Sequence, residues 1–305
     1  MKSVETPTTL EDIAKALGLS ASTVSRALSG KGRISEETVN KVKAYMEGHN
    51  YKPNMLAKGL AKGRSYSICA VLPSDAVTGQ IPFFYECLMG ICSAGMKSNY
   101  TTMIVTDRED RTGRLESVVS MGKADGYILL RAADDDPALK LLLDKKCRTV
   151  VVGNPGVEDV QFVDEDHEGV CERFTKEVLS RGFKAPAAII GAQKYNVNRS
   201  RKRGFEAAAA EKGVKGTVYT VSGDDGIEAA VNGALQSGAD CIFCGDDTVC
   251  LKVLSLLDAG KRPFVASFYY NESLAVSGIE APRFNSKELG RRAAAILINS
   301  IENKF

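Results

Sequence analysis

The chain has few of the residues and patterns on which enzymes, membrane proteins and exported proteins depend. It contains two histidines, His49 and His167, and neither has a catalytic-triad neighbour in the sequence. It also contains no phosphate-binding P-loop, no HExxH helix and no GxSxG elbow. No run approaches the roughly 18 apolar residues of a membrane helix, and the first residues, MKSVETPTTLED, lack an apolar signal core. We therefore expect a cytoplasmic protein that is not an enzyme, with no membrane segment, catalytic residue, metal site or cofactor.

Net charge is also small, at +2, but it is unevenly distributed along the 305 residues. Residues 1–64 hold eleven Lys and Arg against six Asp and Glu, a net charge of +5. The remaining residues hold 29 against 32, a net charge of −3. The length leaves room for about two domains. A basic segment on a mildly acidic remainder is typical of a phosphate-contacting module joined to a ligand-sensing domain.

Cysteine is the one reactive residue type that is abundant, with eight positions that lie mostly inside apolar runs. Cys241 and Cys244 form a CxxC pattern, which is common in metal and redox sites. Here the pattern falls in ADCIFCGDD, a predicted buried strand, where positions i and i+3 point to opposite faces. Joint ligation of a metal is therefore not expected, and we interpret the cysteines as reduced and structural.

The first fifty residues carry the spacing of a helix-turn-helix. One predicted helix has apolar residues at i, i+3, i+4 and i+7, which are Leu10, Ile13, Ala14 and Leu17. Gly18 ends it, and Ser20 is the expected N-cap of a second helix over Ala21–Leu28. Ser35 begins a third helix. The pattern fits a DNA-reading motif, but it also fits an ordinary three-helix cap in which the polar residues serve only as N-caps.

From residue 66 the pattern changes to short apolar runs that alternate with helical stretches. The predicted strands are 67–72, 101–106, 126–130, 149–152, 160–163, 187–191, 217–221, 241–244, 264–268 and 274–278. The predicted helices are 83–98, 112–122, 137–145, 167–181, 199–212, 226–236, 248–259 and 286–303. This alternation indicates two doubly wound parallel-sheet α/β lobes, with a ligand cleft where the carboxyl ends of their strands meet. We place the first crossing between lobes near Asp164 and the return near Glu280–Phe284.

These motifs together resemble the LacI/GalR family of bacterial transcription regulators. The order D-I-A, then S-x-x-T-V-S-R-x-L, then Y-x-P-N-x-x-A-(K/R)-x-L is specific as a set, and it runs from Asp12 to Leu60. The resemblance implies an all-α helix-turn-helix headpiece over residues 1–52 and a hinge helix with linker over 53–65. It implies a periplasmic-binding-protein-like effector and dimerisation domain over 66–305. Lobe one would comprise about 66–163 plus 284–305, and lobe two about 164–283.

Arg26 is the predicted base reader of the second helix. Its guanidinium can donate two hydrogen bonds to a guanine edge, although an Arg that pairs only with a phosphate is the alternative. The resemblance makes Ala21 and Ser22 the specificity positions, and their small size predicts sparse direct readout. The full set of DNA-contacting positions that the resemblance implies is Thr9, Ser20, Ala21, Ser22, Thr23, Ser25, Arg26, Tyr51, Asn54, Ala57, Lys58 and Leu60.

Within that set, Thr23, Ser25 and Tyr51 are expected to contact phosphates, which position a protein without specifying sequence. Leu60 resembles the family's hinge leucine, which wedges into the minor groove and kinks the duplex, with Lys58 beside it. The alternative for Leu60 is an ordinary linker residue.

In the α/β part, the resemblance assigns effector contacts to aromatic and polar residues near strand ends: Phe83, Phe84, Arg131, Asn154, Arg201, Asp247 and Tyr269. The chain departs from the family pattern where Glu165 and Asp246 stand in place of asparagines, and where Tyr269 stands in place of an acidic residue. Arg201 lies in a basic stretch at a predicted helix start, which favours anions. This motivates the hypothesis of an anionic effector, with a solvated basic turn as the alternative.

The predicted function is that of a DNA-binding transcription regulator, a repressor that acts as a homodimer on near-palindromic double-stranded operator DNA. A small-molecule effector in the cleft, a sugar or a sugar derivative, would switch operator affinity, by induction or by corepression. A solute-binding protein and an α/β-fold enzyme remain the alternatives.

Overall fold

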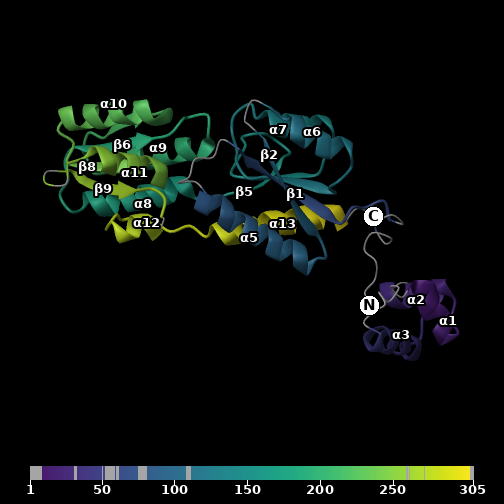
Figure 1. Ribbon diagram of the computed structural model, residues 1–305. Coiled ribbons are helices and arrows are strands. Elements are labelled where there is room, and N and C mark those ends of the chain that lie inside the picture. The colour runs from purple at the N-terminus through teal and green to yellow at the C-terminus, as the bar shows by residue number, and fades with distance from the viewer. Residues whose placement is uncertain are drawn as a thin grey trace, which may run out of the picture. The chain divides into compact units, whose positions relative to one another are not determined.

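The structure is a computed structural model, and it describes residues 9–30, 33–49, 51, 59, 62–74, 81–107, 111–258, 260, 262–270 and 272–302. The chain forms two compact units, Met1–Arg64 and Ser65–Phe305, which we call the head and the body (Figure 1). Among the described helices, none combines the length and the apolar character that a membrane crossing requires.

In the described residues of the head, helices surround one small core. Helix α1 (Leu10–Leu17) ends at Gly18, whose φ of 67° is the left-handed conformation that glycine adopts without strain. Helix α2 (Ala21–Ser29) and helix α3 (Glu36–Gly48) begin after the N-caps Ser20 and Ser35, as the sequence predicts. The centre of the core is formed by the buried residues Ile13, Ala14, Val24, Ala27 and Val42.

The first lobe of the body contains a five-stranded parallel sheet in the order β2-β1-β3-β4-β5. Its strands are β1 (Ser67–Pro73), β2 (Thr101–Asp107), β3 (Gly126–Leu129), β4 (Thr149–Val152) and β5 (Gln161–Val163). Helices α6 (Gly113–Ser120) and α7 (Pro137–Asp144) cover one face through Leu115, Leu139 and Leu142. Helices α5 (Ile81–Lys97) and α13 (Ser286–Glu302) cover the other face, so the sheet is doubly wound.

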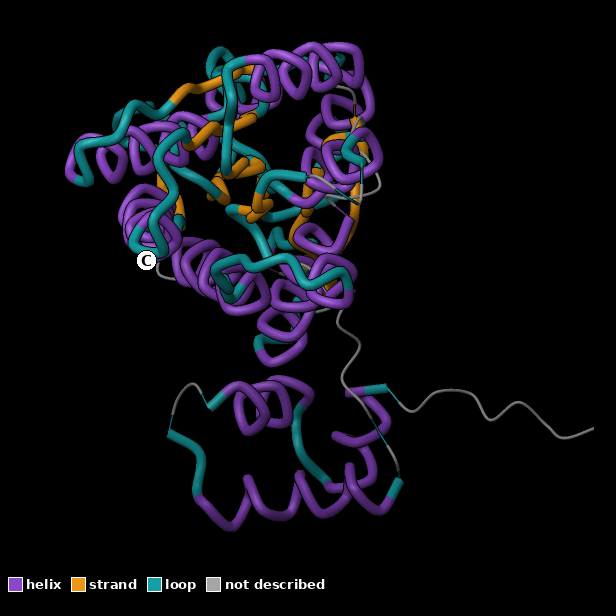
Figure 2. The backbone as a smooth tube through the Cα atoms, turned by 90° about the vertical axis from the view of Figure 1, so that its left-hand side faces the viewer, coloured by secondary structure: helices purple, strands orange, loops and turns teal. Residues whose placement is uncertain are grey.

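The second lobe contains a four-stranded parallel sheet in the order β7-β6-β8-β9. Its strands are β6 (Pro186–Ile190), β7 (Thr217–Thr220), β8 (Cys241–Cys244) and β9 (Phe264–Ser267). Helices α8 (His167–Leu179) and α9 (Asn196–Glu211) pack on one face, and helices α10 (Gly223–Gln236) and α11 (Asp247–Leu256) on the other (Figure 2).

The two cysteines of the CxxC pattern lie on opposite faces of β8, as the sequence predicts. Cys241 packs into the cluster beneath α8 and α9, whereas Cys244 packs into the opposite cluster beneath α10 and α11. Burial raises the pKa of the Cys241 thiol to about 12. Two thiols on opposite faces of one strand cannot share a metal ion, and both behave as small apolar core residues.

The chain passes between the lobes at two places in the described ranges. It leaves lobe one after Val163, and it returns between Glu280, which bridges to Ala266 of β9, and Ser286, where α13 begins.

One predicted strand is wrong. Residues 274–278 belong to helix α12 (Glu272–Val276) and the turn after it, not to a strand. Leu274 is buried and Val276 is 91 % exposed, so the two residues face different environments, although the same face of a strand would hold both. The apolar run is short, and short runs fit a helix or a strand equally well. In addition, α9 begins three residues before the predicted start at Arg199.

Helices α5 and α13 cross at a point where both carry glycine. A Cβ atom placed on Gly90 would lie 2.0 Å from the carbonyl oxygen of Lys287, and one placed on Gly290 would lie 2.0 Å from the carbonyl oxygen of Cys87. Only glycine permits an approach this close between two helix backbones. This glycine crossing fixes α13 against α5 at the edge of the space between the lobes.

Candidate functional site

The exposed face of α2 is the first candidate site. Val24 and Ala27 anchor the helix in the head core, which leaves Ala21, Ser22 and Ser25 exposed on the other side. Arg26 lies on this exposed side, one turn after Ser22. Such a face combines small residues at the helix start with one long donor, which is the shape of a recognition helix that enters a major groove.

Hydroxyl groups at the start of α2 form a connected cluster. The Ser20 hydroxyl accepts the backbone N–H of Thr23 at 3.1 Å, and it lies 2.8 Å from the hydroxyls of both Ser22 and Thr23. The cap therefore fixes the orientation of three side chains, those of Ser20, Ser22 and Thr23, that are predicted to contact DNA. The N–H groups of the first helical turn also favour a phosphate at this position.

The remaining predicted contacts of the head have varied surroundings. Thr9 is exposed and caps α1, because its hydroxyl oxygen accepts the Asp12 backbone N–H at 3.1 Å. In return, the Thr9 N–H and hydroxyl donate to the Asp12 carboxylate at 2.8 and 2.7 Å. These hydrogen bonds lower the pKa of Asp12. Tyr51 is half-buried against the head core, and burial raises the pKa of its phenol. Four predicted contacts lie outside the described residues: Asn54, Ala57, Lys58 and Leu60.

The second candidate site is a cavity of about 130 Å³ between the lobes of the body. It brings together six of the seven predicted effector contacts: Phe83, Phe84, Arg131, Arg201, Asp247 and Tyr269. The seventh, Asn154, does not line the cavity. Its backbone N–H donates to Asp164 at 3.0 Å, and its side-chain oxygen accepts the N–H of Gly156 at 2.8 Å. Asn154 therefore supports the cavity wall and does not form it.

Aromatic rings form one side of the cavity. Tyr269 packs edge-on against Phe83 at a centroid distance of 6.1 Å and is stacked with Phe284 at 6.3 Å. Its hydroxyl lies 3.2 Å from the Ser286 hydroxyl, which fixes the ring. Burial raises the pKa of Tyr269, so the phenol stays protonated. Flat apolar faces next to fixed polar groups are the usual wall of a small-molecule site.

Arg201 is the buried cation of the cavity. It projects from the second turn of α9, is only 6 % exposed, and donates to the Asn198 side-chain oxygen at 3.2 Å. The Nε atom is buried and has no hydrogen-bond partner in the described part of the chain. A buried donor without a partner is costly, so this atom favours a ligand that carries an acceptor.

Four carboxylates face the same cavity: Asp164, Glu165, Asp246 and Asp247. Asp164 accepts the N–H groups of Asn154 and Glu165 at 3.0 and 2.9 Å, yet burial raises its pKa. Burial raises the pKa of Glu165 as well. Asp246 is the N-cap of α11 and accepts the Val249 N–H at 2.9 Å.

His167 is an uncharged member of this lining. Its ring packs on Phe284 at 4.7 Å, and its Nε2 lies 3.6 Å from Asp164. Burial, with Arg201 nearby, lowers the pKa of His167 to about 3. The imidazole is therefore neutral at physiological pH, and its buried Nδ1 has no partner among the described residues.

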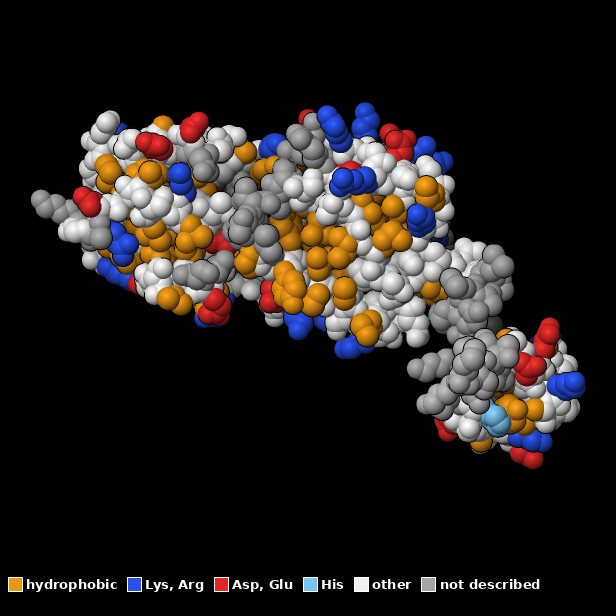
Figure 3. Space-filling model, in the orientation of Figure 1, with side chains coloured by type: hydrophobic (Ala, Val, Ile, Leu, Met, Phe, Trp, Pro, Cys, Tyr) orange, Lys and Arg blue, Asp and Glu red, His pale blue; other side chains and the backbone are white. Residues whose placement is uncertain are grey.

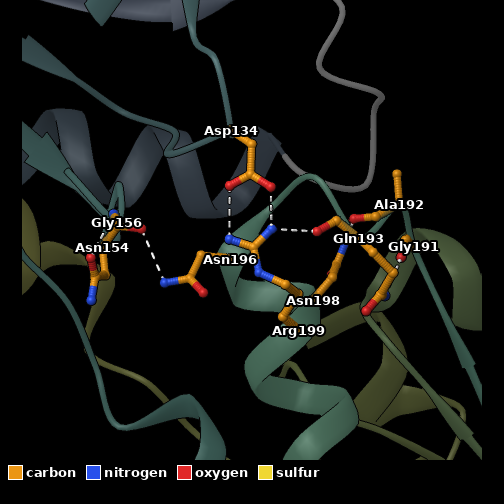
Figure 4. A network of polar contacts seen from close by, with 9 residues as sticks. All are labelled: Asp134, Asn154, Gly156, Gly191, Ala192, Gln193, Asn196, Asn198 and Arg199. Atoms are coloured by element: carbon orange, nitrogen blue, oxygen red, sulfur yellow. Dashed lines mark hydrogen bonds and ion pairs between the residues drawn. The ribbon is translucent and has the colours of Figure 1, made fainter.

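At one edge of the cavity, four residues join the lobes, and we call them the clasp: Asp134, Asn154, Asn196 and Arg199 (Figure 4). Arg199 of lobe two donates to both carboxylate oxygens of Asp134 in lobe one at 2.6 and 2.9 Å. The Asn196 side chain donates to the Asn154 carbonyl at 3.1 Å. The clasp is continued by a backbone hydrogen bond of 2.9 Å from the Asp134 N–H to the carbonyl of Lys194.

The partners of the basic residues near the start of α9 change the interpretation of this stretch. Arg199 pairs with Asp134, Arg203 pairs with Glu168 at 2.6 Å, and Lys202 lies 3.8 Å from Glu206. Of the basic residues in this stretch, Arg201 lines the cavity, and the other three do not. The ground for expecting an anionic effector, a concentration of positive charge at this helix start, is therefore removed.

Several lining residues were not among the predicted effector contacts: Asp164, Glu165, His167, Tyr195, Asn198, Asp246, Phe284 and Ser286. A signal existed for Asp164 and Asp246, because each follows a strand closely and carboxyl ends of parallel strands face ligands. Tyr195 and Phe284 had no local signal, since tertiary packing alone brings them to the cavity. In the described residues, no cluster of His, Cys, Asp and Glu is arranged to hold a metal ion.

Comparison with known proteins matches the chain to bacterial transcription regulators. The family model for bacterial regulatory proteins of the lacI family matches residues 9–54. The HTH-type transcriptional regulator MalR of Streptococcus pneumoniae is 33 % identical over 198 residues, which is 64 % of this chain and 60 % of that relative's length. CelR of Thermobifida fusca is 27 % identical over 311 residues, with 96 % of this chain and 92 % of the relative covered.

Solved structures agree on the fold. The complex of the regulator CelR with cellobiose has a TM-score of 0.71 at 24 % identity, and it covers 98 % of this chain and 94 % of that one. The lac repressor dimer bound to operator and an anti-inducer has a TM-score of 0.74 at 18 % identity, with the same coverage. The helical head and the two-lobed body therefore have the fold of these proteins.

Proposed function

Because the chain belongs to the LacI family of bacterial regulatory proteins, we propose that it is a sequence-specific DNA-binding transcription regulator, and specifically a repressor. A small-molecule effector in the interlobe cavity would switch its affinity for operator DNA. The named relatives, MalR and CelR, are transcription regulators, which supports the proposal for this chain.

One observation carries the DNA-binding part of the proposal. The face of α2 that bears Ala21, Ser22, Ser25 and Arg26 points away from the head core, within the segment that the family model matches. All four side chains are exposed, and small residues with one Arg are what a major-groove helix needs. The excess of positive charge in residues 1–64 adds attraction to phosphates.

The test is selection of bound sequences from a random DNA pool by the full chain, followed by affinity measurements at a fixed salt concentration. We expect a near-palindromic site, since a symmetric dimer contacts two equivalent half-sites. Arg26→Ala should cost about 1–3 kcal/mol on the selected site and relax preference at one position of each half-site. Selection that yields no consensus would contradict the proposal, and Lys43→Ala, on the exposed side of α3, serves as the control.

For dimerisation, we propose a surface on α5. Tyr85, Met89 and Met96 are 56, 38 and 77 % exposed and lie at i, i+4 and i+11, so they form a stripe along one face of the helix. Figure 3 shows hydrophobic side chains gathered where Figure 1 places α5. Exposed apolar stripes of this kind mark protein–protein contacts. Met89→Glu with Met96→Glu should convert a dimer to monomers in sedimentation equilibrium.

For regulation, we propose that the two lobes adopt two arrangements and that the effector binds one of them better. The arrangement described here joins the lobes through the clasp. Arg201→Ala should abolish the effector's influence on operator binding and leave operator binding without effector unchanged, because Arg201 lies in the body cavity. An effector response that survives this substitution would show that the cavity is not the effector site.

A sugar or a sugar derivative is the proposed effector class. Aromatic rings beside fixed hydrogen-bonding groups suit a polyhydroxylated ring, which presents apolar faces and polar edges. The CelR structure is a complex with cellobiose, which supports this class for a relative of the same fold.

A further inference from the structure

The charges that line the interlobe cavity do not balance. Four carboxylates, Asp164, Glu165, Asp246 and Asp247, face two guanidinium groups, Arg131 and Arg201. The one histidine in the lining, His167, adds no positive charge, because it is buried and neutral. With all four carboxylates ionised, the lining carries a net charge of −2. An anionic ligand in this cavity would be repelled, whereas a cationic ligand would be attracted.

The neighbouring cations correct the imbalance only in part. Arg199, Lys202 and Arg203 lie on the same helix as Arg201, but each lies beside a carboxylate outside the cavity. Arg292 acts to lower the pKa of Glu165, but it is exposed and does not line the cavity. Burial raises the pKa of both Asp164 and Glu165, which shows that the protein's own positive charge only partly offsets the cost of burying these carboxylates. A ligand cation would supply the missing charge.

The lining also leaves two buried nitrogen atoms without a hydrogen-bond partner. They are the Nε of Arg201 and the Nδ1 of His167, among the residues that the structure describes. The Arg201 Nε–H needs an acceptor such as a ligand hydroxyl oxygen, whereas Nδ1 of the neutral His167, whose Nε2 faces the Asp164 carboxylate, accepts from a ligand hydroxyl or ammonium group. The aromatic faces of Phe83, Tyr269 and Phe284 favour a flat or ring-shaped molecule, and aromatic faces attract cations as well.

From this lining we infer that the effector is a hydroxylated ring compound that carries a protonated amino group, of the amino-sugar class. The inference rests on the proposed function, because it takes the interlobe cavity as the effector site. Glu165 and Asp246 are the residues that we expect to set the preference, since both carboxylates line the cavity and remain partly exposed. A neutral amide at either position would not attract an ammonium group as a carboxylate does.

The first experiment compares ligands that share a ring and differ in charge, by calorimetric titration of the full chain at pH 7. The probes are glucosamine, glucose, N-acetylglucosamine and glucose 6-phosphate, with the corresponding galactose series and with the disaccharides cellobiose, maltose and deacetylated chitobiose. At least one amino sugar should bind about tenfold more tightly than the neutral sugar from which it derives. The phosphate of that neutral sugar, such as glucose 6-phosphate, should not bind. Equal or tighter binding of a neutral or anionic member, or failure of every amine to bind, would overturn the inference.

The second experiment removes the charges without changing the shape of the lining. Glu165→Gln and Asp246→Asn should each lower the affinity for the amine about three- to tenfold and leave that of the neutral parent unchanged. Asparagine is as good an N-cap as aspartate, so Asp246→Asn preserves the start of α11. Glu168→Gln is the matched control, because Glu168 pairs with Arg203 outside the cavity. Equal losses for the amine and its neutral parent would indicate structural damage and contradict the charge argument.

A readout of operator binding separates the two proposals. If the unsubstituted chain shows no preference for the amine but binds operator DNA in an effector-sensitive way, the amine inference alone is overturned. Failure of the full chain to bind any selected DNA would instead overturn the proposed function, whatever the cavity binds.

Discussion

The ion pair between Asp134 and Arg199 gives a quantitative prediction about the stability of the closed cavity. Arg199 donates to both oxygens of Asp134, but the side chains are 30 and 52 % exposed, so solvent screens the pair. Exposed pairs contribute about 0.2–1 kcal/mol, and the two-pronged geometry places this pair in the upper part of that range. Its loss should therefore raise the population of open lobes about two- to fivefold.

Amide hydrogen exchange of the ligand-free chain measures this opening directly. The Asp134 N–H donates across the lobes to the carbonyl of Lys194 at 2.9 Å, so it exchanges when the lobes separate. In Arg199→Ala this amide should exchange about two- to fivefold faster. Because the Arg199 guanidinium also donates to the Gln193 carbonyl within lobe two, Asp134→Asn and the double variant complete a mutant cycle that isolates the interlobe pair.

The pair between Arg203 and Glu168 is the matched control. Arg203 lies on the same helix, its side chain and that of Glu168 are 50 and 46 % exposed, and both residues belong to lobe two. Arg203→Ala should leave exchange at Asp134 unchanged. Equal acceleration by Arg203→Ala and Arg199→Ala, or a coupling energy of zero in the cycle, would refute the conclusion that the pair keeps the lobes together.

Three further predictions concern stability. The pKa of His167 is lowered from 6.5 to about 3. Below pH 6.5 the unfolded chain therefore binds a proton at this residue, whereas the folded chain does not. Going from pH 7.5 to 5.5 should therefore cost the body about 1.4 kcal/mol that His167→Gln does not lose, in urea unfolding at both pH values; parallel slopes would refute the assignment. Gly90→Ala should destabilise the body by about 3 kcal/mol or more, because its Cβ would meet a backbone carbonyl, while Gly113→Ala, with open space around it, should change the melting temperature little. Ser20→Ala should cost the head about 1 kcal/mol by removing the N-cap of α2, read from the loss of helical circular dichroism on heating, and an unchanged head would contradict the capping role.

Local signals explain why most elements were predictable from the sequence. The caps Ser20 and Ser35 and the glycine at position 18 act within a few residues, so the sequence contains all the information that places the head helices. Central strands of the body such as β6 and β8 are buried on both faces, and continuous apolar runs identify them. Where the run is short, as at 274–278, the same residues fit a helix, and contacts with the rest of the lobe decided the outcome.

The cavity was predictable only in part, because contacts between distant segments of the chain form it. Phe83, Arg201 and Tyr269 were found through resemblance and strand ends, but the partners that set their chemistry come from distant segments. Arg199 shows this most clearly, because its carboxylate partner Asp134 lies 65 residues away in the chain. No pattern around Arg199 distinguishes a residue that joins two lobes from one that attracts an anion.

The glycine crossing of α5 and α13 has a consequence for how a bound molecule could be sensed at a distance. Phe83 and Phe84 of α5 line the cavity, and Tyr85, the next residue, begins the exposed apolar stripe on the same helix. Two backbones in direct contact at Gly90 and Gly290 have no intervening side chain whose rotamer could absorb a displacement. A ligand that shifts the cavity end of α5 must then move α13 and the stripe together, so the surface that we propose for dimerisation would respond to the cavity through rigid-body motion of the helix pair.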